Sequence, residues 1–177
     1  MKYALILSVA AAALISGPVL AQSTAEKTGI NSVIGVAPKT ADFVTEAASS
    51  DMFEIESSKL ALERGDAPTK AFAQQMINDH EKTTNELKQM VSSGKVKAEI
   101  PTKMISAHQS MFDKLKGLQG ADFVKQYHSD QEKAHEQAVD LFKRYGDGGD
   151  NSGLKAWATQ TRPALEHHLE MAKKLNQ

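Results

Sequence analysis

Apolar side chains recur at helical spacing along most of the chain after residue 40, and glycine, proline and capping residues divide the pattern into segments. We expect long helices over about 41–65, 66–94, 122–145 and 152–176, with a kink at Pro163 in the last. A shorter helix is expected to open at Pro101 and to end near Gly117 to Gly120. No alternating run of β-branched residues favours a strand, so the predicted fold class is all-α.

The lengths of the connections predict how these helices are arranged. Tight turns join the first helix to the second and the fourth to the fifth, so each pair should form an antiparallel hairpin. About 27 residues, Gly94 to Gly120, separate the two hairpins and are long enough to cross back along a bundle. We therefore predict a ferritin-like four-helix bundle of two antiparallel hairpins, with a short extra helix in the long crossover.

The first 21 residues have the pattern of a secretory signal peptide. Lys2 precedes an apolar run from Ala4 to Ile15, and small residues up to Ala21 fit a cleavage site. We expect residues 1–21 to be removed on export to the periplasm, residues 22–40 to form a flexible leader, and residues 41–177 to form the bundle. The alternative is that the apolar segment is retained as an anchor.

Composition narrows the function classes. Without Lys2 the chain has 20 basic and 22 acidic residues, and this near-neutral balance argues against binding to nucleic acid or to an anionic membrane surface. No stretch after the signal reaches the length of a membrane span. The chain has no cysteine, which excludes disulfides, zinc–thiolate sites and thiol catalysis.

Ionisable residues interrupt the apolar stripes of all four long helices. At about 100° per residue, His80, His135 and His168 fall inside the stripes of the second, fourth and last helices. Glu54 lies toward one edge of the first stripe, and Glu132 flanks the stripe of the fourth helix, which also contains His128. Five of these residues are our candidate metal ligands: Glu54, His80, Glu132, His135 and His168.

Burying such groups without partners would cost several kcal/mol each, so they should share an ion or satisfy one another. Imidazole and carboxylate groups suit iron, zinc or copper, and Glu132 and His135 have the Glu-x-x-His spacing that places two ligands on one helical face. The alternative is a metal-free network of Glu–His hydrogen bonds that fixes the register of the helices.

Short motifs in a fixed order resemble one known family. They are Phe43-Val44 with Met52 to Glu56, Lys70 to Ala73 with Met76 to His80, Gly120 to Phe123 with Tyr127, and Arg162 to Leu165 with His168-Leu169. This pattern is similar to that of the exported bacterial proteins grouped as domain-of-unknown-function family 4142. The resemblance spans about residues 41–175. It implies a ferritin-like bundle in the periplasm or outer envelope and no established activity.

The characteristic Glu and His positions of that family fall on Glu54, His80, His135 and His168. Di-iron proteins have two Glu-x-x-His pairs, whereas this chain has one, and Ile77 and Leu165 stand three residues before His80 and His168. A single histidine-rich ion is therefore favoured over a di-iron centre.

Three functions follow, in order of preference. The first is a non-catalytic metal-binding envelope protein, the second a metal-free structural or partner-binding bundle, and the third a ferroxidase-like oxidoreductase. No substrate or reaction is identified. The sequence names no partner, and a homodimer is the one assembly that we consider.

Overall fold

The computed structural model describes residues 23–24 and 30–177 of the 177-residue chain. The regular elements in this part are all helices, which confirms the all-α prediction. Their bounds are α2 Ile30–Val33, α3 Thr40–Arg64, α4 Ala67–Ser92, α5 Ser106–Lys116, α6 Gly120–Gly148 and α7 Ser152–Leu175. The predicted signal peptide, residues 1–21, lies outside the described residues. No helix in the described part is long and apolar enough to cross a membrane.

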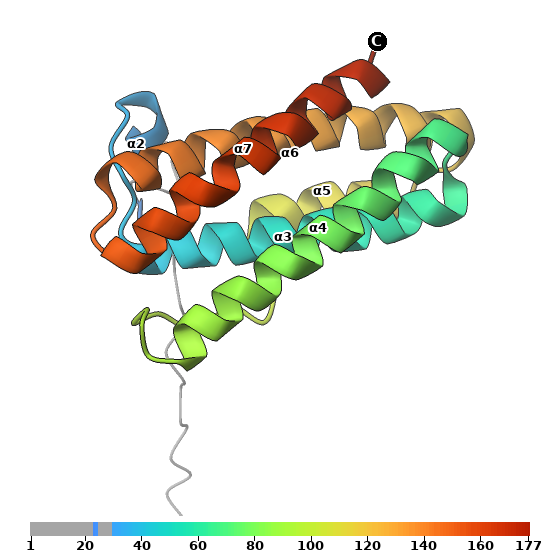
Figure 1. Ribbon diagram of the computed structural model, residues 1–177. Coiled ribbons are helices and arrows are strands. Elements are labelled where there is room, and N and C mark those ends of the chain that lie inside the picture. The colour runs from blue at the N-terminus through green and yellow to red at the C-terminus, as the bar shows by residue number, and fades with distance from the viewer. Residues whose placement is uncertain (1–22, 25–29) are drawn as a thin grey trace, which may run out of the picture.

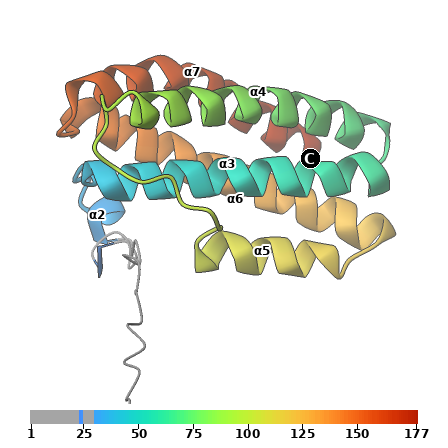
Figure 2. The same ribbon diagram turned by 90° about the horizontal axis from the view of Figure 1, so that it is seen from below.

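The four long helices pair as the connection lengths predict. α3 and α4 form an antiparallel hairpin through a two-residue turn, and α6 and α7 form another (Figure 1). The hairpins pack through α3 against α6 and through α4 against α7. Seen from below, α4 and α7 form one layer, α3 and α6 the next, and α5 covers the far side of α3 and α6 (Figure 2). α3 is therefore enclosed on several sides.

Local chemistry explains where α4 and α5 begin. Asp66 caps α4 by accepting a hydrogen bond from the Thr69 amide at 3.0 Å, as its position before a proline predicts. α5 begins at Ser106, later than the predicted start at Pro101. The Ile105 amide donates to the Ser49 hydroxyl of α3 at 2.9 Å, and Ile105 is extended. This hydrogen bond to α3 accompanies the extended backbone of Ile105, and α5 starts at the next residue.

The glycines after Tyr145 do not end α6 where the sequence predicted. The helix continues to Gly148, and the Gly149 amide then donates to the Tyr145 carbonyl. A Cβ atom at Gly146 would lie 2.9 Å from the Thr159 hydroxyl of α7. Gly146 therefore allows the two helices of this hairpin to approach closely, and it does so from within the helix.

The segment before α3, which the sequence predicted to be a flexible leader, contacts α6 within residues 30–39. It contains the single turn α2. The Ser32 hydroxyl donates to the Asp140 carboxylate at 2.8 Å, and the Arg144 guanidinium donates to the Val36 carbonyl at 2.8 Å. These bonds hold the described part of the leader against the bundle.

Two apolar clusters fill the interior, one toward each end of the bundle. The first includes Phe43 stacked on Tyr145 with ring centroids 4.1 Å apart. The second includes Phe53, Phe72 and Tyr127. On α4, α6 and α7 the residues of the first cluster are separated from those of the second by a histidine: His80, His135 and His168. The interior is thus apolar, polar and apolar along its length.

Candidate metal centre

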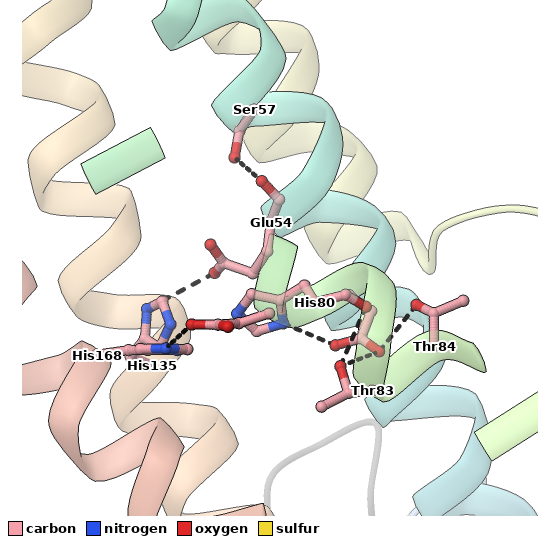
Figure 3. A network of polar contacts seen from close by, with 9 residues as sticks. Glu54, Ser57, His80, Thr83, Thr84, His135 and His168 are labelled. Atoms are coloured by element: carbon pink, nitrogen blue, oxygen red, sulfur yellow. Dashed lines mark hydrogen bonds and ion pairs between the residues drawn. The ribbon is translucent and has the colours of Figure 1, made fainter. Parts of the chain in front are cut away.

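Three histidines from three helices meet in the middle of the bundle. His80 of α4, His135 of α6 and His168 of α7 are 2%, 1% and 3% exposed. Their ring centroids lie 5.4 to 5.6 Å apart. One ring nitrogen of each lies within 4.8 Å of those of the other two. Figure 3 shows the rings gathered beside Glu54. The helical projection therefore placed these three side chains together correctly.

Asp51 of α3 fixes the orientation of His80. Its Oδ1 accepts a hydrogen bond from Nδ1 of His80 at 2.8 Å. Its Oδ2 accepts from the hydroxyls of Thr83 and Thr84 at 2.9 and 3.0 Å. The Asp51 carboxylate therefore keeps a proton on Nδ1 of His80. Nε2 of His80, on the opposite side of the ring, is buried and has no hydrogen-bond partner. Asp51 was not among the predicted site residues.

The other two histidines are anchored in the same manner. Nδ1 of His135 donates to the backbone carbonyl of Gln131, one turn earlier on α6, at 2.8 Å. Nε2 of His168 donates to Oδ2 of Asp79 on α4 at 2.9 Å. The remaining nitrogens, Nε2 of His135 and Nδ1 of His168, are buried and have no partner. A ligating histidine typically donates its other N–H to a carboxylate or carbonyl, and all three histidines have such an acceptor.

Glu54 of α3 brings a carboxylate to the same layer. It is 1% exposed, and neither of its oxygens has a hydrogen-bond partner. Oε1 lies 3.8 Å from Nδ1 of His135, which is too far for a hydrogen bond. Burial raises the pKa of Glu54 to about 7, although the nearby His80 and the Gln131 amide act to lower it. A cation at this place would favour the charged carboxylate.

The histidines differ in their affinity for protons. Burial lowers the pKa of His135 well below its ordinary value and that of His168 to about 4, and the charge of His80 adds to both effects. Burial also acts to lower the pKa of His80, but the hydrogen bond and charge of Asp51 outweigh it, so this pKa is raised. His135 and His168 are therefore neutral at pH 7, the state in which imidazole binds a metal ion.

Glu132, the fifth predicted ligand, lies outside the cluster. It is half-buried, and its Oε2 accepts a hydrogen bond from the Asn176 amide at 2.7 Å. Three residues along a helix correspond to about 60° of rotation from His135, which turns Glu132 to the flank of α6. His128, which also fell in the apolar stripe, instead bonds to the Thr69 hydroxyl at 2.8 Å through Nε2.

Comparison with known proteins gives a family and a fold. The family model described as "Domain of unknown function (DUF4142)" matches residues 25–175, so the chain belongs to that family, as the sequence motifs indicated. No curated protein matches the chain. A solved structure titled "CopM in the Cu(II)-bound form" is similar with a TM-score of 0.65 and 16% identity. The match covers 80% of this chain and 97% of that one, and at this identity it shows the fold alone.

Proposed function

We propose that this member of the DUF4142 family binds one divalent transition-metal ion through His80, His135 and His168, with Glu54 as an additional ligand. One observation carries the proposal. Each of the three buried imidazoles has one nitrogen bound to an outer acceptor and the other left without a partner in a shared interior layer. In a neutral ring the bound nitrogen fixes the tautomer and the second nitrogen has a lone pair for an ion. His80, whose pKa is raised, would release its second proton when the ion binds.

The distribution of unpaired polar atoms supports an ion over a metal-free network. In the described residues, eight buried side-chain nitrogen or oxygen atoms have no hydrogen-bond partner. Five of the eight belong to Glu54, His80, His135 and His168. Each such atom typically costs about 1 to 3 kcal/mol. A metal-free network would instead pair the Glu54 carboxylate with one of the imidazoles. Oε1 of Glu54 nevertheless lies 3.8 Å from Nδ1 of His135, beyond hydrogen-bond distance.

Among iron, zinc and copper, we propose Cu(II) first. Three imidazole nitrogens and one carboxylate suit all three metals, and the affinity of such sites for divalent ions is greatest for Cu(II). The structurally similar CopM is titled as Cu(II)-bound, which agrees with this choice.

We also propose the finer points of fold and location. Two antiparallel hairpins joined by a long connection that carries α5 correspond to a ferritin-like arrangement. The basic, apolar and small-residue pattern of residues 1–21 supports export and a periplasmic location. The ion would then bind outside the cytoplasm. A homodimer stays a prediction.

The test is the metal content of protein purified from the periplasm without a metal-affinity tag. We expect about one equivalent of a transition metal, and we expect His168→Ala to lose it. His167→Ala is the matched control because His167 is the exposed neighbour of His168 on α7. Less than about a tenth of an equivalent in the wild-type protein, with no thermal shift when Cu(II), Zn(II) or Fe(II) is added, would contradict the proposal.

A further inference from the structure

A pocket of about 300 Å³ opens between α4 and α7 and ends at the histidine layer. His80 and His168 form part of its inner wall. Each of these side chains is at least nine-tenths buried and has one ring nitrogen without a partner. The pocket thus connects two of the proposed ligands with the surface.

The outer part of the pocket carries two carboxylates. The side chains of Asp79 and Glu86 are 44% and 40% exposed, and both line the pocket. Asp79 also accepts the hydrogen bond of His168, so one carboxylate contacts both solvent and a buried imidazole. Lys82 also lines the pocket, with its ammonium 4.0 Å from Glu86. Two carboxylates and one ammonium leave the rim with a net negative charge.

Packed side chains cover the histidine layer in at least three other directions within the described residues. The two apolar clusters lie above and below the layer, and α5 covers the α3–α6 face. The pocket is also large enough for a hydrated ion, because six waters at about 30 Å³ each occupy about 180 Å³.

We infer that this pocket is the entrance through which hydrated divalent cations reach the metal centre, and that Asp79 and Glu86 attract them to its mouth. The inference rests on the proposed metal binding. The rim carboxylates attract the hydrated cation, and the imidazoles replace its water deeper in the pocket. Since Ala164 and Glu86 are neither proposed ligands nor hydrogen-bond partners of the three histidines, a change at either position that hinders passage should slow entry and exit together and leave the equilibrium affinity unchanged.

A tryptophan in the pocket allows the entry and release of the ion to be followed by fluorescence. Trp157, the one tryptophan of the chain, lines the pocket and donates its indole N–H to Glu86 at 2.8 Å. Binding of Cu(II), an efficient quencher, can therefore be followed by Trp157 fluorescence in a stopped-flow instrument. Release can be followed by mixing the loaded protein with excess chelator.

Ala164→Phe is the variant that narrows the pocket, because Ala164 lines it and is exposed on α7. Glu170→Phe is the control, an exposed position on the same helix outside the pocket. For Ala164→Phe we expect Cu(II) association and release both to slow about tenfold or more, with Kd within about threefold of the wild type. Association and release rates within about twofold of the wild type would contradict the proposal that this pocket is the entrance. A weaker Kd without slower release would contradict it as well.

A second variant tests the charge of the rim and does not depend on how Ala164→Phe folds. Glu86→Gln retains an acceptor for Trp157, and it should slow Cu(II) association about threefold or more at low salt. The difference should vanish near 0.5 M salt, where charges are screened over a few ångströms. Glu136→Gln, on the surface and paired with Lys173, is the control. An equal change of the Cu(II) association rate in both variants would contradict the proposal that the rim carboxylates attract the ion. Failure of the wild-type protein to bind Cu(II), Zn(II) or Fe(II) would instead remove the proposed function.

Discussion

The Asp51 carboxylate on α3 accepts a hydrogen bond from the His80 ring on α4 at 2.8 Å, and both side chains are buried. This bond joins the two helices of the first hairpin at the depth of the histidine layer. It also determines which nitrogen of His80 is free, so the position of one residue on α3 controls a proposed ligand on α4.

Loss of the Asp51 charge should weaken metal binding without removing a ligand. We expect Asp51→Asn to raise the Kd for Cu(II) about 10- to 100-fold, as for other outer partners of metal-binding histidines. The pKa of His80 should fall as well, since burial would no longer be opposed by the carboxylate. Chelator competition measures the first effect and NMR titration of the apoprotein the second. Thr84→Val, which removes one hydroxyl from Asp51, is the milder comparison, and an unchanged Kd in Asp51→Asn would count against this arrangement.

Replacement of Glu54 should have opposite effects on the two forms of the protein. Glu54→Gln removes a buried acid that burial disfavours in its charged form, so the apoprotein should be more stable at pH 8 by roughly 1 to 3 kcal/mol. The metal-loaded protein should lose stability, because the amide is a poorer ligand. Urea unfolding with chelator and with Cu(II) measures both. A gain of stability in both conditions would show that Glu54 does not contact the ion, and a loss in both would contradict the predicted cost of burying its charge.

His108 of α5 should make the fold sensitive to acid. Burial lowers its pKa from 6.5 to about 4, while Nδ1 is hydrogen-bonded to the Ser49 hydroxyl at 2.8 Å. The unfolded chain protonates His108 at a higher pH than the folded chain does. The contribution of the neutral His108 to the free energy of unfolding is therefore fully present above pH 6.5 and is lost as the pH falls toward 4. The loss from this group should reach about 3 kcal/mol.

His108→Asn isolates that contribution, because the side-chain amide can donate or accept a hydrogen bond in place of Nδ1 and does not titrate. We expect the free energy of unfolding of this variant to fall less steeply between pH 7 and 4 than that of the wild type, by roughly that amount, when both are measured by urea unfolding with chelator present. His167→Asn, at an exposed position, should keep the wild-type slope. Parallel pH profiles of the unfolding free energy for the wild type and His108→Asn would show that His108 does not cause the loss of stability in acid.

The close approach of α6 and α7 at Gly146 can be tested by a pair of substitutions. Gly146→Ala should destabilise the protein by about 1 to 3 kcal/mol, because the new Cβ would meet the Thr159 hydroxyl at 2.9 Å. Thr159→Ala removes that atom. Most of the loss should be absent when Thr159→Ala is combined with Gly146→Ala, as thermal melts of the four proteins would show. Additive losses would mean that the two residues do not meet.

The sequence was informative wherever helical periodicity alone decides an outcome. His80, His135 and His168 lie within apolar stripes, and a stripe must face the interior, so their convergence could be predicted. Glu132 stood on a flank, where a small rotation of the helix decides between interior and surface. The structure turns it toward Asn176. Gly146 was read as a stop because composition does not distinguish a helix end from a close helix contact.

The outer partners of the histidines could not be identified in the same way. Asp51 stands one turn before Glu54 and therefore shares its face, which was an available signal. The partner of Asp79 depends on how α4 and α7 are rotated against each other, and it is His168 rather than the adjacent His80. The acceptor of His135 is a backbone carbonyl, which no side-chain pattern reveals.

The most direct test of a metal centre at the three histidines is a crystal structure of the Cu(II)-loaded protein with anomalous data at the copper edge. We expect one strong peak in the bundle interior, about 2.0 to 2.1 Å from Nε2 of His80, Nε2 of His135 and Nδ1 of His168. An interior without a peak, or a peak confined to surface groups such as His167, would contradict the account.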